Sequence, residues 1–426
     1  MTRRLIDDCF LTDKERMSHA EALALIRARV AAVTGTETVS LAASLGRVLA
    51  EEIAAPLDVP LADNAAVDGY AFASVQYEAT GGFFPVVARI PAGHPHPQPV
   101  PVGAAVRIFT GAVMPAGVDT VAMQEDCETH EQDSVDFVVI PPGLKPGANR
   151  RKAGEDLRAG QVVMSPGLRL RPQEVAGLAS LGRTEVLVRQ RLKVAIVSTG
   201  DEIIRPGQPI APGQVYDSNH ALLSALLETA QADVTDLGVL PDRFDVIRDA
   251  LANAAGRFDV ILTSGGASRG EEDHVITALD EIGRRHLWQI AVKPGRPMTF
   301  GQIGDCVFLG LPGNPVAVFV CFLLYGLPLF AGLEGADWRE PVRYRLPARF
   351  AIGRKKADRR EFLRGILVPG EEGHLAVAKF ARDGSGLITG LREADGLIDI
   401  PEAVTGLAEG DLVDFVPFSA FGLRDR

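Results

Sequence analysis

Between residues 193 and 326, short apolar runs alternate with longer amphipathic stretches. Runs such as 258–262 and 287–292 are apolar at nearly every position, which is typical of strands buried on both faces of a sheet. Stretches such as 216–230 and 316–326 have the length and apolar spacing of helices. Strands and helices that alternate in this way predict a doubly wound, mostly parallel sheet.

Shorter and more varied elements are predicted on both sides of this region. Ser18 and Glu21 form a capping-box pair at the start of a helix that is expected to end at Gly35. A second helix is predicted over 41–53. Residues 73–149 form short β-branched runs separated by Gly, Pro or polar turns, which predicts an inserted β-rich domain. Short strands and turns return towards the C-terminus.

The expected fold class is therefore α/β multidomain. A chain of 426 residues is too long for one core, because domains hold about 150 residues each. We expect a doubly wound domain, an inserted β-rich domain, an N-terminal helical or mixed domain and a C-terminal β domain. The predicted bounds are 1–62 with 150–188 for the N-terminal domain, 63–149 for the inserted one, 189–334 for the doubly wound one and 335–426 for the C-terminal, β-barrel-like one.

Composition narrows the range of functions. The chain is 46% hydrophobic and 23% charged, as is usual for soluble globular proteins. Its net charge of −11 argues against general nucleic-acid binding, so an anionic ligand would need local positive groups or a metal. The 4 cysteines form no CxxC pair, and the N-terminus lacks the apolar segment of a signal peptide. We therefore expect a cytoplasmic protein without disulfides or a zinc site.

One uncharged stretch, 306–333, is long enough to span a bilayer. The turn at 311–315 and Pro328 interrupt it. Its flanking charges, Asp305 and Glu334, are acidic, where the orienting bias of a membrane helix would be Lys or Arg. A buried strand, a loop and a buried helix are the better interpretation, and no membrane partner is expected.

Candidate chemistry lies in loops that follow the predicted strands. Four such loops are rich in small residues, at 198–202, 263–273, 293–297 and 310–315. Ligands of open α/β sheets bind at the carboxyl ends of the strands, where these loops would meet. Gly265 and Gly266 would let backbone amides approach an oxyanion, because they carry no Cβ. No GxxxxGK[ST] motif occurs, which excludes a P-loop NTPase.

The charged residues of these loops suit a phosphate together with a divalent cation. Lys293 and Arg296 would meet the phosphate charge, and the helix after Asn314 would present amides to it. Asp273 and Glu202 are predicted to hold Mg²⁺, which needs only one or two protein carboxylates beside water and substrate oxygens. A loop of this kind, taken alone, is equally typical of a tight turn before a solvated acidic helix start.

Seven segments, in order, carry recognisable motifs over almost the whole chain. They are DNAAVDGYAF (63–72), RIFTGAVMP (107–115), RKAGEDLRAG (151–160), STGDEI (198–203), TSGGASRGEED (263–273), VKPGRP (292–297) and GLPGNPVA (310–317). These segments closely resemble the motifs of the molybdopterin molybdenumtransferase family, whose fold also forms the C-terminal catalytic domain of gephyrin.

The resemblance implies an elongated homodimer of four-domain subunits that converts adenylylated molybdopterin and molybdate, with Mg²⁺, into molybdenum cofactor and AMP. In that family the first half of one subunit faces the doubly wound domain of the other, so the active site is shared. The pterin's own dithiolene sulfurs ligate the molybdenum, so no cysteine ligand is expected. Molybdopterin adenylyltransferase and apo molybdoenzymes are candidate protein partners, whereas nucleic acid is not.

The individual site residues, Asp217 and Arg359 excepted, follow from these motif matches. The positions that match the family's catalytic site are Asp68, Thr110, Asp156, Glu202, Asp273 and Lys293. The predicted substrate-binding residues are Ser198, Thr199, Gly200, Asp217, Ser264, Gly265, Gly266, Ser268, Arg296, Pro312, Gly313, Asn314 and Arg359. The predicted metal ligands are Asp273 and Glu202.

Some motifs depart from the family pattern. The usual KPGK reads KPGR, which places the planar guanidinium of Arg296 where the family has lysine. The usual GGVSVG reads GGASRG, which adds a charge at Arg269, and DNSAMDGY reads DNAAVDGY. The basic stretch 354–364, Arg359 excepted, is interpreted as a solvated face.

Two other functions stay open at this point. A molybdopterin adenylyltransferase resembles the doubly wound domain alone, so the long N-terminal half and the C-terminal β domain argue against it. A non-catalytic scaffold of the gephyrin kind would bind a partner peptide through the dimer. The acids of the motifs argue instead for an active enzyme.

Overall fold

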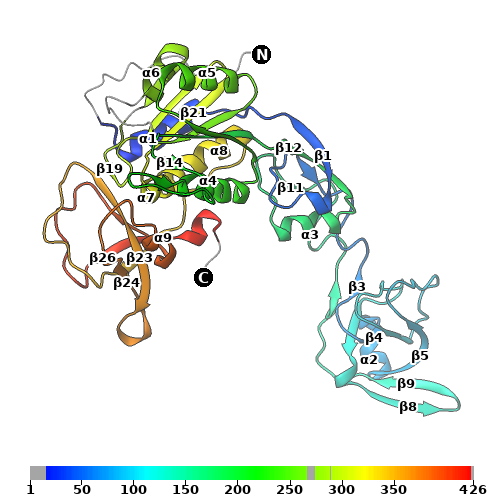
Figure 1. Ribbon diagram of the computed structural model, residues 1–426. Coiled ribbons are helices and arrows are strands. Elements are labelled where there is room, and N and C mark those ends of the chain that lie inside the picture. Colours follow the sequence, from blue (N-terminus) through cyan, green and yellow to red (C-terminus); the bar gives the residue numbers. More distant parts are fainter. Residues whose placement is uncertain (1–15, 266–273, 288, 424–426) are drawn as a thin grey trace. The chain divides into compact units, whose positions relative to one another are not determined.

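The computed structural model describes residues 16–265, 274–287 and 289–423 (Figure 1). The chain forms two compact units. The larger unit consists of Met1–Ala50, Pro166–Val175 and Glu185–Arg426, and the smaller one of Glu51–Ser165 and Ala176–Thr184. The finer division into four domains stays a prediction.

A six-stranded sheet forms the doubly wound part of the larger unit. In spatial order its strands are β16 (Asp233–Leu240), β13 (Lys193–Thr199), β17 (Val260–Ser264), β21 (Cys306–Leu311), β20 (Thr299–Ile303) and β18 (Arg284–Leu287). The first four strands are parallel, and the last two are antiparallel to their neighbours. The predicted α/β fold with a mostly parallel sheet is confirmed, although the sequence pattern did not predict β20.

Both faces of this sheet are covered, as the uninterrupted apolar runs predicted. Along β13, Ile196 belongs to the apolar cluster on the side of α4 (Ser218–Thr229). Its neighbour Val197 belongs to the cluster on the side of α5 (Phe244–Ala255) and α6 (His274–Ile282). Successive side chains of a strand point to opposite faces. The sheet is therefore sandwiched between helices (Figure 1).

The long uncharged stretch ends in a buried helix. It runs from α7 (Pro315–Cys321) through a π-helical turn (Phe322–Gly326) into α8 (Leu327–Glu334). These 20 residues are apolar and long enough to cross a membrane, but 83% of their apolar window is buried within the fold. The predicted helix over 316–326 is thus too short. The π-helical turn shifts the hydrogen-bond pattern just before Pro328, which therefore falls at the start of α8, where a missing amide is tolerated.

The helix predicted over 41–53 is wrong. The segment begins with a 3₁₀ turn, Leu41–Ala43, and Gly46 then takes a left-handed conformation with φ +77°. Further along, the Leu49 amide donates to the Leu168 carbonyl, 2.9 Å away. Pairing with a distant segment has therefore replaced the local helical bonds, which is how tertiary contacts override weak helix propensity.

The single strand predicted over 287–292 is also wrong. It is split between two sheets, because β18 ends at Leu287 and the two-residue strand β19 (Val292–Lys293) pairs with the C-terminal sheet. That sheet has the order β19, β23 (Arg360–Pro369), β25 (Gly396–Ile400), β26 (Leu412–Pro417) and β22 (Tyr344–Pro347), with β24 (Leu375–Lys379) also paired to β23. The predicted C-terminal β part is confirmed.

The smaller unit is built on another six-stranded sheet. Its order is β7 (Thr120–Met123), β4 (Gly69–Phe72), β6 (Ala105–Ile108), β5 (Phe83–Ile90), β9 (Val135–Val139) and β8 (Glu128–Gln132). Apolar clusters that include Val106 on one side and Phe84 on the other form its core. The β-rich character predicted for this part of the chain is confirmed.

The N-terminal helix α1 (His19–Arg29) carries a buried histidine. Ser18 and Glu21 form the predicted capping box, but the helix ends at Arg29, earlier than expected. His19 is only 4% exposed, and its Nδ1 lies 2.8 Å from the Tyr325 hydroxyl. Burial, and next the positive charge of Arg360, lower the pKa of His19 to about 4. The imidazole is therefore neutral in the fold at neutral pH.

The stability of the larger unit should consequently fall in mild acid. The unfolded chain binds a proton at His19 near pH 6.5, whereas the folded one does so only near pH 4. Stability from this group is complete above about pH 6.5 and is lost as the pH falls towards 4. We expect the unfolding free energy, measured by urea titration, to drop by about 1.5 kcal/mol from pH 6.5 to pH 5 because of His19. His19→Gln should remove that part of the slope, and an equal slope in the variant would contradict the assignment.

Candidate active site

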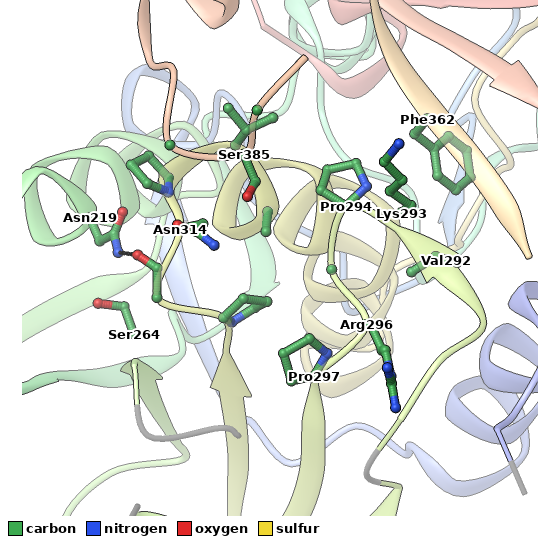
Figure 2. A pocket seen from close by; sticks show the side chains of 18 of the residues that line it. Asn219, Ser264, Val292, Lys293, Pro294, Arg296, Pro297, Asn314, Phe362 and Ser385 are labelled. Carbon is green, nitrogen blue, oxygen red and sulfur yellow. Dashed lines mark hydrogen bonds between the residues drawn. The ribbon is translucent and has the colours of Figure 1, made fainter. Parts of the chain in front are cut away.

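A cavity of about 1170 Å³ lies at the carboxyl edge of the doubly wound sheet, within the larger unit. One wall comes from the ends of β13 and β17 and from the loops before α7 and after β19. The facing wall comes from residues 356–364 and 379–386 of the C-terminal part. Figure 2 shows side chains of both walls around the same space. Loops from four strand ends therefore meet in one place.

Most of the predicted site residues line this cavity. They are Ser198, Thr199, Glu202, Asp217, Ser264, Gly265, Lys293, Arg296, Pro312, Gly313, Asn314 and Arg359. Gly200 lies in the same loop but is not part of the lining. Gly266, Ser268 and Asp273 lie outside the described residues. Asp68, Thr110 and Asp156 belong to the smaller unit.

Apart from Asp217 Oδ2, which is ion-paired with Arg205, two polar atoms of lining residues in the sheet-side wall are buried without a hydrogen-bond partner in the described part of the chain. They are Ser198 Oγ and Asn219 Oδ1, and the amide nitrogen of Asn219 donates to the Gly313 carbonyl, 2.7 Å away. A buried polar group that lacks a partner is costly unless water or a ligand supplies one. Polar groups of a ligand could therefore bind at this end of the cavity, where they would hydrogen-bond to these two atoms.

Asp217 has a structural role as well as a place in the cavity. Its carboxylate caps α4 by accepting the His220 amide at 2.9 Å. It also lies 3.2 Å from Arg205, whose other nitrogen contacts Asp236 at 2.6 Å. Asp217 is thus held in place by a helix start and by an ion pair.

Carboxylates gather beside the end of β13. The Asp201 and Asp242 carboxylates each accept the other residue's backbone amide, at 3.2 and 3.4 Å. Burial, followed by the negative charges of Asp201 and Glu202, raises the pKa of Asp242. No three His, Cys, Asp or Glu side chains within the described ranges form a ready metal cage. The carboxylate oxygens here are nevertheless the hard donor atoms that Mg²⁺ prefers.

Lys293 and Arg296, which the sequence analysis assigned to the same phosphate, are directed apart by the loop after β19. Figure 2 shows the Lys293 and Arg296 side chains extending in opposite directions from it. Gly295, between them, has φ +111°, and a Cβ there would lie 2.3 Å from Cys321 Sγ. A glycine is required at this turn both by conformation and by space.

The start of α7 is partly occupied by the facing wall. The Val316 amide donates to the Ser385 carbonyl at 3.0 Å. The first amides of a helix have no partner inside it, so a loop carbonyl can satisfy them. The helix after Asn314 was expected to present its amides to a phosphate, and one of them is already engaged. This contact fixes loop 383–386 over the cavity.

The basic stretch 354–364 is not a simple solvated face. Lys355 is 5% exposed, and its ammonium donates to the carbonyls of Lys356, Arg359, Pro401 and Glu402 at 2.6–3.3 Å. Arg364 is 8% exposed and donates to the carbonyls of Arg382 and Leu387. Lys355 and Arg364 thus hold loops rather than face water. Lys356, Arg359 and Arg364 of the same stretch line the cavity.

Sequence reasoning missed most of this C-terminal wall. Lys379, Asp383 and Ser385 also line the cavity, and Lys379 pairs with Asp383 at 3.0 Å. The available signal was the small-residue run DGSG at 383–386, which resembles the other cavity loops in composition.

In the smaller unit, the structure joins two predicted residues. Asp68 accepts the Thr110 hydroxyl at 2.7 Å and its amide at 2.8 Å. These hydrogen bonds, the hydroxyl's first, lower the pKa of the exposed Asp68 carboxyl. Asp156 donates its amide to the Val59 carbonyl at 3.0 Å. Asp68 is therefore a carboxylate at neutral pH, pre-oriented by Thr110.

The fold defines a multidomain α/β protein with a cavity at the carboxyl edge of its doubly wound sheet, lined by cationic and small side chains. Three family models match the chain. They are "MoeA N-terminal region (domain I and II)" over residues 17–182, "Probable molybdopterin binding domain" over 195–332 and "MoeA C-terminal region (domain IV)" over 346–418.

Curated relatives and solved structures agree with these models. A molybdopterin molybdenumtransferase of Haemophilus influenzae is 37% identical over 91% of this chain and 95% of its own length. Molybdopterin molybdenumtransferase 2 of Mycobacterium tuberculosis is 34% identical over 88% and 93%. The molybdopterin biosynthesis MoeA protein of Pyrococcus horikoshii OT3 superposes with TM-score 0.80, at 29% identity, over 95% of this chain and 100% of that one. The chain belongs to the molybdopterin molybdenumtransferase family, and it is an enzyme.

The requirement for glycine at position 295 can be tested by substitution. Gly295→Ala should strain the turn and displace Lys293, because the new methyl group meets Cys321 Sγ. We expect kcat/KM to fall by at least about tenfold, the scale of roughly 1.4 kcal/mol in the transition state. Cys321→Ala in the same chain should restore part of the loss by removing the clash. Unchanged kcat/KM in Gly295→Ala would show that the turn does not position the lysine.

Proposed function

We propose that this enzyme inserts molybdenum in molybdenum cofactor biosynthesis, converting adenylylated molybdopterin and molybdate into molybdenum cofactor and AMP. The observation that carries the proposal is the charge of the cavity. Its described lining holds 7 cationic side chains and 4 acids, whereas the whole chain has a net charge of −11. Positive charge concentrated in one pocket of an acidic protein favours an anionic ligand.

The two walls suggest how such a substrate would lie. Lys293 and Arg359 would hold phosphate or molybdate oxygens, because charge-assisted hydrogen bonds are the strongest available there. Ser198 Oγ and Asn219 Oδ1 would pair with polar groups of the pterin, which would satisfy both atoms. Holding the two reactants against each other converts their encounter into an intramolecular step.

The carboxylates beside β13 fit the Mg²⁺ that the family implies. Glu202 lines the cavity, and its negative charge helps to raise the pKa of neighbouring Asp242, a repulsion that a divalent cation would offset. Glu202, together with Asp273, would hold the ion. When bound, Mg²⁺ neutralises charge that develops on the phosphate oxygens. We also expect the enzyme to be cytoplasmic.

We further infer that the active form is a homodimer in which Asp68, Thr110 and Asp156 act on the cavity of the other subunit. The Thr110 hydrogen bonds keep Asp68 ionised and fix its direction, as a group that acts on a substrate requires. This arrangement would complete each cavity with carboxylates from the partner. Molybdopterin adenylyltransferase and apo molybdoenzymes remain the protein partners that we would test first.

Turnover of the defined substrates tests the proposed reaction. Purified protein is incubated with adenylylated molybdopterin, molybdate and Mg²⁺, and both AMP release and activation of an apo molybdoenzyme are followed. We expect AMP release that depends on molybdate and stops on chelation of Mg²⁺. Consumption of ATP with molybdopterin would instead indicate an adenylyltransferase, and no turnover with either set would indicate a scaffold.

Mixed dimers test the shared site. Dimers made only of Asp68→Ala subunits, or only of Lys293→Ala subunits, should have strongly reduced activity, because every site then lacks one of its two contributions. Co-refolded mixtures should recover activity, since half of the sites in a mixed dimer carry neither substitution. A fully active monomer in light scattering, or no recovery on mixing, would refute the shared site.

A further inference from the structure

Glu361 lies behind the cavity wall, between two of the cations that line it. The strand pairing of β19 with β23 sets Lys293 directly beside Glu361. The Glu361 side chain is 9% exposed, whereas that of Lys293 is 48% exposed and that of Arg359 is 31% exposed. The cations thus face the cavity, and the carboxylate sits beneath them.

The contacts of this carboxylate divide between its two oxygens. Oε1 accepts from Arg359 Nε at 2.9 Å and lies 2.8 Å from Nη2. Oε2 lies 3.7 Å from Lys293 Nζ, which is within ion-pair range but too long for a hydrogen bond. Lys293 can therefore direct its N–H groups to a ligand while its charge stays balanced from below.

Without a negative charge between them, Lys293 and Arg359 would repel each other across the wall. Exposed lysine and arginine side chains also have many rotamers, whose freedom must be lost when a ligand binds. A buried carboxylate joined to both cations removes part of that cost in advance.

We propose that Glu361 is a positioning residue that holds Lys293 and Arg359 as a paired grip for one oxyanion, either the substrate phosphate or molybdate. Nothing in the motif matches assigns a role to this residue. Where it concerns turnover, this role rests on the proposed function. Its effect on anion binding does not.

Charge alone and positioning predict opposite effects of Glu361→Gln on anion binding, which makes the positioning role testable. Glu361→Gln removes one negative charge from beneath the wall, so charge alone should tighten anion binding. If positioning dominates, binding should weaken although the cavity becomes more positive. The sign of the change therefore separates the two effects.

The experiment titrates wild type, Glu361→Gln and Glu361→Asp with molybdate and, separately, with AMP. We expect the dissociation constant of at least one anion to rise about tenfold in Glu361→Gln, and the affected anion identifies the occupant. Glu361→Asp should be similarly weakened, because it keeps the charge but shortens the reach to the cations. It also serves if Glu361→Gln does not fold. In turnover, we expect Glu361→Gln to raise KM for that substrate, rather than to lower kcat and leave KM unchanged.

Glu334→Gln is the matched control, because Glu334 is another buried carboxylate paired with an arginine, Arg169, and lies outside the cavity lining. It should lower the melting temperature while leaving both dissociation constants unchanged. Unchanged or tighter binding of both anions in Glu361→Gln, or failure of wild type to bind either, would overturn the inference. Wild type that binds anions but releases no AMP would count against the proposed function instead.

Discussion

The cavity depends on a two-residue strand pairing, that of β19 with β23. The Arg360 amide donates to the Ala291 carbonyl at 2.9 Å, and Val292 and Lys293 lie in parallel register with Arg360 and Glu361. Through this pairing, a loop at the carboxyl edge of the doubly wound sheet becomes the first strand of the C-terminal sheet. The two cavity walls are therefore parts of one hydrogen-bonded structure.

A buried ion pair at Arg360 reinforces the same junction. Arg360 contacts both oxygens of Asp399, at 2.6 and 2.8 Å, and Asp399 is fully buried. Breaking such a pair leaves an uncompensated buried charge and typically costs about 3–5 kcal/mol. Next to Arg360 along the chain, Glu361 contacts Arg359 and Lys293 beneath the cavity wall. Arg360 and Glu361 are successive residues of β23 with side chains of opposite direction, so the first serves the core and the second the site.

The parts of the fold with regular local patterns were predictable from the sequence. Uninterrupted apolar runs revealed β13 and β17, because burial on both faces leaves no alternation. The strand-end loops followed from topology, and their glycines and charges pointed to an anion site. The helix predicted over 41–53 failed because its amides pair with distant carbonyls, a partner that no local pattern reveals. The prediction of the C-terminal wall failed for a similar reason, since Lys355 and Arg364 also donate to carbonyls of loops remote in sequence, those of Pro401 and Arg382.

The pairing of β19 with β23 holds the two cavity walls together as one unit. Hydrogen exchange at the Arg360 amide, resolved to single residues, tests this most directly, because that amide donates across the junction. We expect it to be protected in the free enzyme to about the same extent as the amide of Leu363, which lies in the pairing of β23 with β25. An Arg360 amide that exchanges as fast as an exposed one, while Leu363 stays protected, would show that this pairing does not hold the walls together.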